Sequence, residues 1–127
     1  MPFVRIALMK GRPAGFGKKI GEVVYGAMVN TINVPVDDHF QLITEHDRDS
    51  LIYHPNFLGI ARTDGFVFVQ ITLNEGRTVE LKKALYREIV GNLRKELGVR
   101  DEDVFINLVE VKKENWSLGG GVAQFAL

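Results

Sequence analysis

The sequence contains no cysteine. Disulfide bonds, a thiolate nucleophile and a cysteine-based zinc site are therefore excluded. It also contains no run of about 18 apolar residues, the length that a membrane-spanning helix requires. The first residues, MPFVRIALMKGR, lack the charged lead-in, long apolar run and cleavage site of a secretory signal. We therefore expect a soluble, cytoplasmic protein without a membrane partner.

Net charge is absent as well, since sixteen Lys and Arg residues balance sixteen Asp and Glu residues. Without a long-range field of one sign, we expect no nucleic-acid partner and favour a small ligand that is neutral or locally charged. The histidines His39, His46 and His54 do not have the spacing of metal ligands, so we expect no metal site. A length of 127 residues fits one domain with one core.

An internal repeat organises the chain. The segment PFVRIALMKGR, beginning at Pro2, aligns without a gap with VFVQITLNEGR, beginning at Val67. The same offset keeps apolar, polar and glycine positions matched throughout both halves and pairs Asp38 with Asp103. Both halves are therefore expected to share one supersecondary plan. We expect a single domain over residues 1–127, divided into repeat one (2–45), a connector (46–66), repeat two (67–111) and a C-terminal tail (112–127).

Each repeat has the pattern of a strand, a Gly-Arg turn, a helix and a second strand. Apolar residues alternate along the first strands, at Val4, Ile6 and Leu8 and at Val69, Ile71 and Leu73. They recur every three or four positions in the helices, at Ile20, Val24, Met28 and Ile32 and at Leu81, Leu85, Ile89, Leu93 and Leu97. Pro13 and Thr78 suit the helix starts, and Gly98 suits the end of the second helix. The sequence predicts a two-layer α/β (α+β) fold, in which two β-α-β units form one four-stranded sheet with both helices on one face.

The other face of this sheet has a mixed composition. Its predicted residues are Phe3, Arg5, Ala7, Phe68, Gln70 and Thr72. This set is too apolar for open solvent and too polar for a core, so we expect a homo-oligomer. In the connector, LIY at 51–53 can form a short strand, and Gly119, Gly120 and Gly121 favour a turn in the tail.

Pro2 is the first candidate for chemistry. Enzymes that remove the initiator Met favour small second residues, so we expect the mature chain to begin with Pro2. Its nitrogen would then be a free secondary amine. An α-amino group titrates near roughly 7.7 to 8.0, far below Lys, and can act as a base at neutral pH. In the second repeat the same position is Val67, so only the half with a chain end can carry the amine.

Five further side chains are candidates for the site, at the expected helix starts, before the second strand and in the tail. Arg12 and Arg77 both follow Gly at a strand-to-helix turn, where a guanidinium and helix amides can hold a carboxylate or a developing enolate. Asp38 is expected to start the second strand, where it can orient a water or a protonated amine. Trp116 and Leu118 can form an apolar wall that lowers the dielectric near the amine.

These residues resemble the tautomerase superfamily, with its 4-oxalocrotonate tautomerase-like fold, and within it the malonate semialdehyde decarboxylase-like group. The likeness covers nearly the whole chain. It rests on Pro2, GAMV at 26–29, VPVDD ending at Asp38, Gly76-Arg77, and NWS followed by a glycine-rich run. The resemblance implies a duplicated β-α-β subunit, a homotrimer, no metal or organic cofactor, and catalysis by the amino-terminal proline.

Carried over residue by residue, the resemblance implies that Pro2 is the base or acid and that Arg77 binds a substrate carboxylate or carbonyl oxygen. It implies that Asp38 is the active-site Asp and that Trp116 and Leu118 form the apolar wall. The decarboxylase group has a second Arg two residues before the one that matches Arg77, and here Glu75 stands in its place. We include Glu75 with Trp116 and Leu118 among the predicted substrate-binding residues.

Three functions stay open from the sequence. Because a single guanidinium suffices for keto-enol proton transfer, we favour a tautomerase acting on a small 2-oxo or enol carboxylate. The alternative is decarboxylation or hydration of a 3-oxo or unsaturated acid, as in the malonate semialdehyde decarboxylase-like group. The third is a non-catalytic oligomeric binding module, which applies if Met1 is retained, since fold does not determine function.

Overall fold

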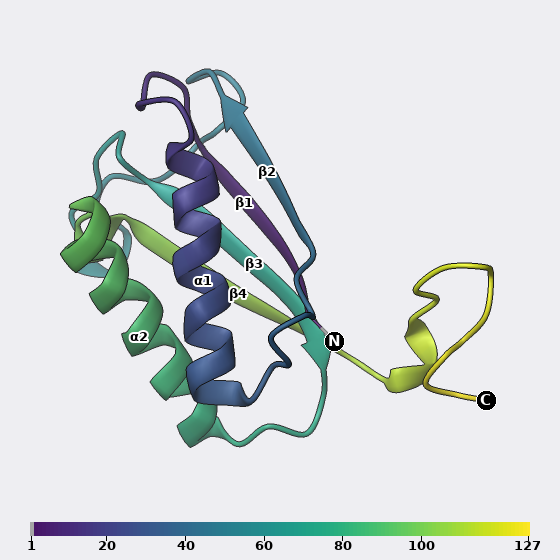
Figure 1. The fold of residues 1–127 in the computed structure, drawn as a ribbon. Coiled ribbons are helices and arrows are strands. Elements are labelled where there is room, and N and C mark those ends of the chain that lie inside the picture. The colour runs from purple at the N-terminus through teal and green to yellow at the C-terminus, as the bar shows by residue number, and fades with distance from the viewer. Residues whose placement is uncertain (1) are drawn as a thin grey trace.

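The computed structural model describes residues 2–127, and the predicted removal of Met1 concerns a residue outside this range. Its strands are β1 (Phe3–Met9), β2 (Gln41–His46), β3 (Val67–Asn74) and β4 (Val104–Val111), and its helices are α1 (Phe16–Ile32) and α2 (Val79–Leu97). Three short 3₁₀ turns complete the secondary structure: η1 (Phe57–Gly59), η2 (Asp101–Asp103) and η3 (Lys113–Asn115). The four strands form one sheet in the order β2-β1-β3-β4, and both helices cover the same face (Figure 1). The predicted fold class is confirmed.

The strand register relates the two halves of the sheet. β1 pairs with β2 in parallel, Val4 opposite Gln41, and β3 pairs with β4 in parallel, Val67 opposite Val104. The central strands β1 and β3 are antiparallel, with Arg5 opposite Gln70. The start of β1 therefore lies beside the end of β3, at one end of the sheet.

The core lies between the sheet and the helices. Every second residue of β1 and β3 points into it, as the period-two pattern predicts, and Val4, Ile6 and Leu8 are each at most 2% exposed. Burying one such aliphatic side chain stabilises the fold by roughly 1.5–3 kcal/mol. The helices contribute Ile20, Val24, Ala27, Met28, Leu85, Ile89 and Leu93. Leu81, in the first turn of α2, was predicted on this face but is exposed.

The helix ends agree with the sequence in repeat two and differ in repeat one. Thr78 caps α2, its hydroxyl accepting a hydrogen bond from the Leu81 amide, and Gly98 ends it in the left-handed conformation at φ 67°. Pro13, however, lies before α1 and not in its first turn, because a turn closed by the Phe16 amide and the Pro13 carbonyl precedes the helix.

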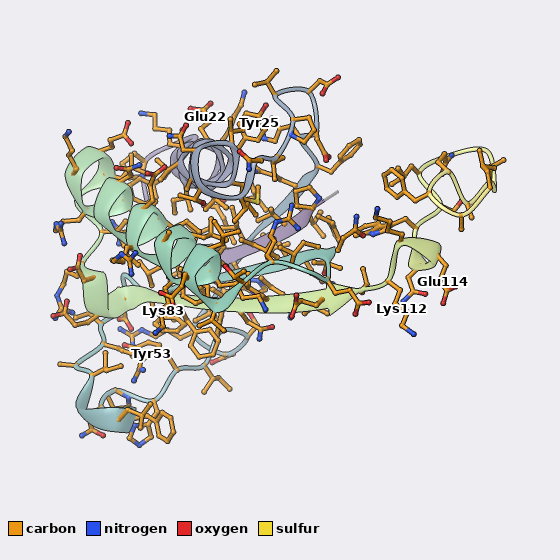
Figure 2. The ribbon with its side chains drawn as sticks, turned by 90° about the horizontal axis from the view of Figure 1, so that it is seen from below. Glu22, Tyr25, Tyr53, Lys83, Lys112 and Glu114 are labelled. Atoms are coloured by element: carbon orange, nitrogen blue, oxygen red, sulfur yellow. The ribbon has the colours of Figure 1, made fainter. Side chains whose placement is uncertain are left out.

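Two connections differ from the sequence expectation. Residues 51–53 form no strand, because Leu51 packs instead into a small cluster with Met9 and Phe66. The tail beyond β4 forms η3 and turns at Gly119–Gly121, and it projects away from the body of the domain (Figures 1 and 2). No helix within residues 2–127 is long and apolar enough to cross a membrane.

Candidate active site

Pro2 is buried at the entrance to β1. The amide of Val4 donates a 3.1 Å hydrogen bond to the carbonyl of Phe40, which fixes the start of β1 against the segment before β2. Continuing the two registers by one or two residues brings Pro2 opposite His39 on one side and Leu73 on the other. The nitrogen of Pro2 therefore lies on a rigid part of the backbone, between the Asp38 turn and the end of β3.

Asp38 lies in the turn that precedes β2, not at the start of the strand as predicted. Its amide donates to the Pro35 carbonyl at 3.0 Å, and β2 begins three residues later at Gln41. The side chain is half-buried, and this burial raises the pKa of the Asp38 carboxyl above its usual value of 3.8. The positive charge of the amino terminus lowers the same pKa, and the neighbouring Asp37 raises it. The Asp38 carboxyl is thus a half-buried acid at the sheet end where Pro2 leads into β1.

Arg77 connects β3 to the end of α1. Its Nη1 donates to the Asn74 carbonyl at 3.2 Å and its Nη2 to the Ile32 carbonyl at 3.3 Å. Ile32 is the last residue of α1, and a cation is favourable beside the carbonyl end of a helix. Gly76, at φ 118°, forms the turn that directs the guanidinium toward this position. The half-buried cation is thereby held at the sheet end that contains Pro2.

Glu110 and Lys82 lie beside the Arg77 turn. Lys82 Nζ and Glu110 Oε1 form a 2.7 Å ion pair between α2 and β4. This hydrogen bond is the main reason that the pKa of Glu110 is lowered, and the Gly76 amide and the Arg77 charge act in the same direction. The pair therefore adds a fixed carboxylate behind the guanidinium.

Trp116 is joined to the same end of the sheet, whereas Leu118 is not. The indole Nε1 of Trp116 donates a 2.7 Å hydrogen bond to Oδ1 of Asn74, and the side chain is half-buried. Leu118 is in the projecting tail and is 40% exposed, with its amide bonded to Gln124. Glu75 is exposed, and its amide donates to the Val111 carbonyl at 2.9 Å. One end of the sheet thus brings together five of the predicted site residues: Pro2, Asp38, Glu75, Arg77 and Trp116. Leu118 lies apart from them in the tail.

Asn74 was missed by the sequence analysis. Its backbone carbonyl holds Arg77 and its side chain holds Trp116, so it links two predicted site residues. The repeat contains a signal for it, because the matching position in the first strand is the apolar Met9. A polar residue at the end of this strand, where the other repeat has an apolar one, indicates a role specific to the second repeat.

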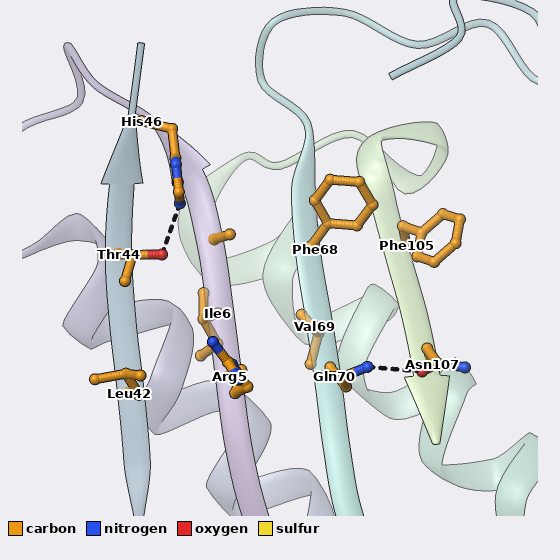
Figure 3. Close-up of a pocket in the computed structure, with 11 residues that line it drawn as sticks. Arg5, Ile6, Leu42, Thr44, His46, Phe68, Val69, Gln70, Phe105 and Asn107 are labelled. Atoms are coloured by element: carbon orange, nitrogen blue, oxygen red, sulfur yellow. Dashed lines mark hydrogen bonds between the residues drawn. The ribbon is translucent and has the colours of Figure 1, made fainter. Parts of the chain in front are cut away.

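A hollow of about 660 Å³ lies elsewhere, on the uncovered face of the sheet (Figure 3). Its lining includes Arg5, Leu42, Phe68 and Phe105, with a hydrogen bond between Thr44 and His46 (2.7 Å) and one from Gln70 to Asn107 (3.1 Å). This mixed apolar and polar lining matches the predicted face. Because the charged groups and the chain end converge at the Pro2 end instead, we assign the candidate active site there. Within residues 2–127 there is no group of three His, Asp or Glu side chains able to hold a metal ion.

Comparison with known proteins identifies the class of protein to which this chain belongs. Two family models, each described as a tautomerase enzyme, match residues 2–60 and 38–119. The chain is 44% identical over 124 residues to the probable tautomerase YusQ of Bacillus subtilis (strain 168), covering 98% of each protein. The chain belongs to the tautomerase family, as its residues suggested, and is an enzyme. Family membership argues against the non-catalytic binding module.

Solved structures give the same assignment. The FG41 malonate semialdehyde decarboxylase inhibited by 3-bromopropiolate has a TM-score of 0.90 and 32% identity, over 97% of this chain and 93% of that one. A fused 4-OT symmetric trimer has a TM-score of 0.78 over 98% of both chains, and at 24% identity this likeness shows the fold alone.

Proposed function

We propose that this enzyme is a cofactor-independent tautomerase that uses the amino-terminal nitrogen of Pro2 for keto-enol proton transfer on a small 2-oxo or enol carboxylate. The observation that supports this proposal is the convergence of the chain's start, the half-buried Asp38 carboxylate and the Arg77 guanidinium at one end of the sheet. Among these groups, only the chain end can be an uncharged base near neutral pH.

In the proposed proton transfer, Pro2, Arg77 and Asp38 each have one role. The Pro2 nitrogen takes the proton of the enol hydroxyl, and the resulting prolyl ammonium gives a proton to the adjacent carbon, which yields the keto acid. Arg77 donates its N–H groups to the enolate oxygen or the substrate carboxylate, where the negative charge is greatest. Asp38 stabilises the ammonium form between the two transfers, because an opposite charge nearby favours a protonated amine.

We further propose that the working enzyme is a homotrimer. The uncovered sheet face, with its hollow of about 660 Å³, presents an area that packing between subunits would bury. The fused 4-OT structure with the same fold is a symmetric trimer. In such an assembly the projecting tail can carry Leu118 to a neighbouring subunit, where it would extend the apolar wall begun by Trp116.

Decarboxylation or hydration of a 3-oxo acid is the second candidate. It is favoured by the 32% identity to a malonate semialdehyde decarboxylase and by the position of Asp38 near the chain end. Glu75, which stands where that group has a second Arg, weighs against it, because the carboxylate and the enolate oxygen would share one guanidinium.

The test uses protein whose mass shows that Met1 has been removed. Pro2→Ala is expected to lower phenylpyruvate enol-to-keto turnover by about 10²-fold or more, the typical contribution of a positioned base. Pro13→Ala, at an exposed proline outside the site, is the matched control and should retain full turnover. Full turnover by Pro2→Ala would exclude the proline mechanism. Release of carbon dioxide from malonate semialdehyde, abolished by Asp38→Asn, would instead favour the second candidate.

A further inference from the structure

The repeat places a second arginine at the opposite end of the sheet. Arg12 follows Gly11 after β1, as Arg77 follows Gly76 after β3. The loop after β1 lies beside the end of β2, at the end of the sheet away from the chain start (Figure 1). This end is the counterpart of the candidate active site under the internal duplication.

The N–H groups of the Arg12 guanidinium are available to bind a ligand. It lies 4.7 Å from the centre of the Phe16 ring, which holds its plane by a cation-π contact. Unlike Arg77, Arg12 forms no hydrogen bond or ion pair with any side chain or carbonyl in residues 2–127. A β-carbon at position 65 would lie 2.7 Å from its Nη2, so the glycine found there leaves the space that the half-buried guanidinium needs.

Arg12 borders a cavity whose own lining has one more positive than negative charge. The cavity, of about 400 Å³, is lined by Met9, Lys10, Gly11, Arg12, His46, Asp47, Arg48 and Asp64. Lys10 pairs with Asp47, and Arg48 pairs with Asp64. Each pair is neutral in itself, which leaves Arg12 as the unpaired charge of this lining. The buried Asp103 carboxylate also lies beside Gly65, but the Arg100 guanidinium, 3.5 Å away, offsets its charge. A planar guanidinium with free N–H groups is suited to a carboxylate, which it can bind with two parallel hydrogen bonds.

An apolar hollow adjoins this cavity. It has a volume of about 260 Å³, shares Met9, Arg48 and Asp64 with the first, and adds Leu51, Ile52, Tyr53 and Pro55. The hydroxyl of Tyr53 donates to Asp64, which lines both spaces, at 2.7 Å, so the aromatic ring is fixed in the wall of the apolar hollow. A ligand with its carboxylate on Arg12 can therefore place an apolar or aromatic group against Tyr53.

The groups that would act on such a ligand are missing from this end. Val67 occupies the place of Pro2, and it is an internal strand residue with an amide nitrogen that has no basicity. Asp103, the counterpart of Asp38, is 2% exposed and accepts hydrogen bonds from the Thr63 amide (2.7 Å) and hydroxyl (2.6 Å). Arg100 also forms an ion pair with it at 3.5 Å, so Thr63 and Arg100 together occupy this carboxylate.

We propose that the Arg12 end is a second binding site for a small carboxylate bearing an apolar or aromatic group, which it holds without turnover. The site is independent of the proposed catalytic function, since it needs neither a free Pro2 nor Arg77. One carboxylate on one guanidinium, with a small apolar contact, is expected to bind with a dissociation constant on the order of 1–10 mM.

The test is an NMR titration of the full-length protein with phenylacetate, following the side-chain Nε–H signals of Arg12 and Arg77. We expect a saturable shift of the Arg12 signal in the wild type and an equal shift in Arg77→Gln. In Arg12→Gln, the amides of Gly11 and Tyr53 should no longer respond. Benzyl alcohol, which has the ring without the carboxylate, should leave Arg12 unmoved.

Three results would overturn the proposal. The first is an Arg12 signal that does not shift up to about 100 mM phenylacetate, roughly tenfold above the upper end of the expected dissociation constant. The second is an equal shift with benzyl alcohol, which would show that the carboxylate is not recognised. The third is loss of the Arg12 shift in Arg77→Gln, which would show that there is only one site. None of these outcomes depends on whether the enzyme turns over an enol.

Discussion

The indole nitrogen of Trp116 donates a 2.7 Å hydrogen bond to the side-chain oxygen of Asn74, the last residue of β3. The backbone carbonyl of the same Asn74 accepts a hydrogen bond from Arg77. One residue at the end of a central strand therefore sets the positions of an aromatic ring and a cation that the proposed reaction uses.

Asn74→Ala is expected to release the indole. The loss of one hydrogen bond should cost about 1 kcal/mol of unfolding free energy. Trp116 is the sole tryptophan of the chain, so its fluorescence emission reports the change directly and should shift to longer wavelength. Asn107→Ala, which removes a similar strand side chain bonded to Gln70, is the matched control and should leave the emission unchanged. An unchanged spectrum in Asn74→Ala would contradict this role.

Asp38→Asn and Asp103→Asn should have opposite effects, although the two residues are equivalent in the repeat. Because burial raises the pKa of Asp38, the folded state binds its proton more tightly than the unfolded chain does. The wild type therefore loses stability as the pH rises from the usual Asp38 value of 3.8 through the raised one. Asp38→Asn removes this loss and should be more stable than the wild type at pH about 7, but not at pH about 3.

Asp103→Asn weakens two hydrogen bonds that a buried carboxylate accepts from Thr63, and should be destabilised by about 1–3 kcal/mol near neutral pH. Urea unfolding of both variants and the wild type, at pH about 7 and about 3, measures the change in unfolding free energy for each substitution. Equal destabilisation of both variants at neutral pH would refute the distinction.

Arg77→Gln should lower kcat/KM for enol-to-keto turnover by about 10²-fold, because removing one oxyanion donor costs roughly 2.7–4 kcal/mol of transition-state stabilisation. Arg87→Gln, at an exposed position of α2, is the control and should behave as the wild type. Steady-state kinetics with a fixed enzyme concentration distinguish the two. A fall in Arg77→Gln confined to stability, with normal kcat/KM, would assign Arg77 a structural role only.

Glu75→Gln should lower KM for an anionic substrate, since an exposed carboxylate two residues from Arg77 repels it. The expected change is about threefold at low ionic strength and should disappear near 1 M salt, where the Debye length is about 3 Å. Glu80→Gln, in the first turn of α2, tests whether any loss of negative charge has the same effect. An unchanged KM at low salt would exclude Glu75 from the substrate-binding surface.

The sequence predicts the framework of the site because that framework follows from periodicity. Alternation in β1 and β3 and the glycine turns before Arg12 and Arg77 are local signals, and parallel pairing within each repeat then brings Asp38 toward Pro2. The division into two repeats, a connector and a tail remains a proposal that truncation at residue 111 would test.

Other features depend on contacts that periodicity does not encode. Residues 51–53 form no strand because burying Leu51 against Phe66 replaces pairing at a sheet edge. Asp38 lies before β2 because its amide closes a turn with the Pro35 carbonyl. The first contact of this segment with β1 is made two residues later, where the Phe40 carbonyl accepts from the Val4 amide. The bond between Trp116 and Asn74 joins residues 42 apart in the chain. The place of Leu118 depends on a second subunit in the proposed trimer, which no pattern in one chain specifies.

The most direct test of the central claim combines intact mass with enol-to-keto turnover of phenylpyruvate on one sample. The account predicts that the protein lacks the mass of Met1 and is active, and that protein with Met1 retained is inactive, because an amide nitrogen at Pro2 has no basicity. Equal turnover by the processed and unprocessed forms would contradict the proposal that the Pro2 nitrogen is the base.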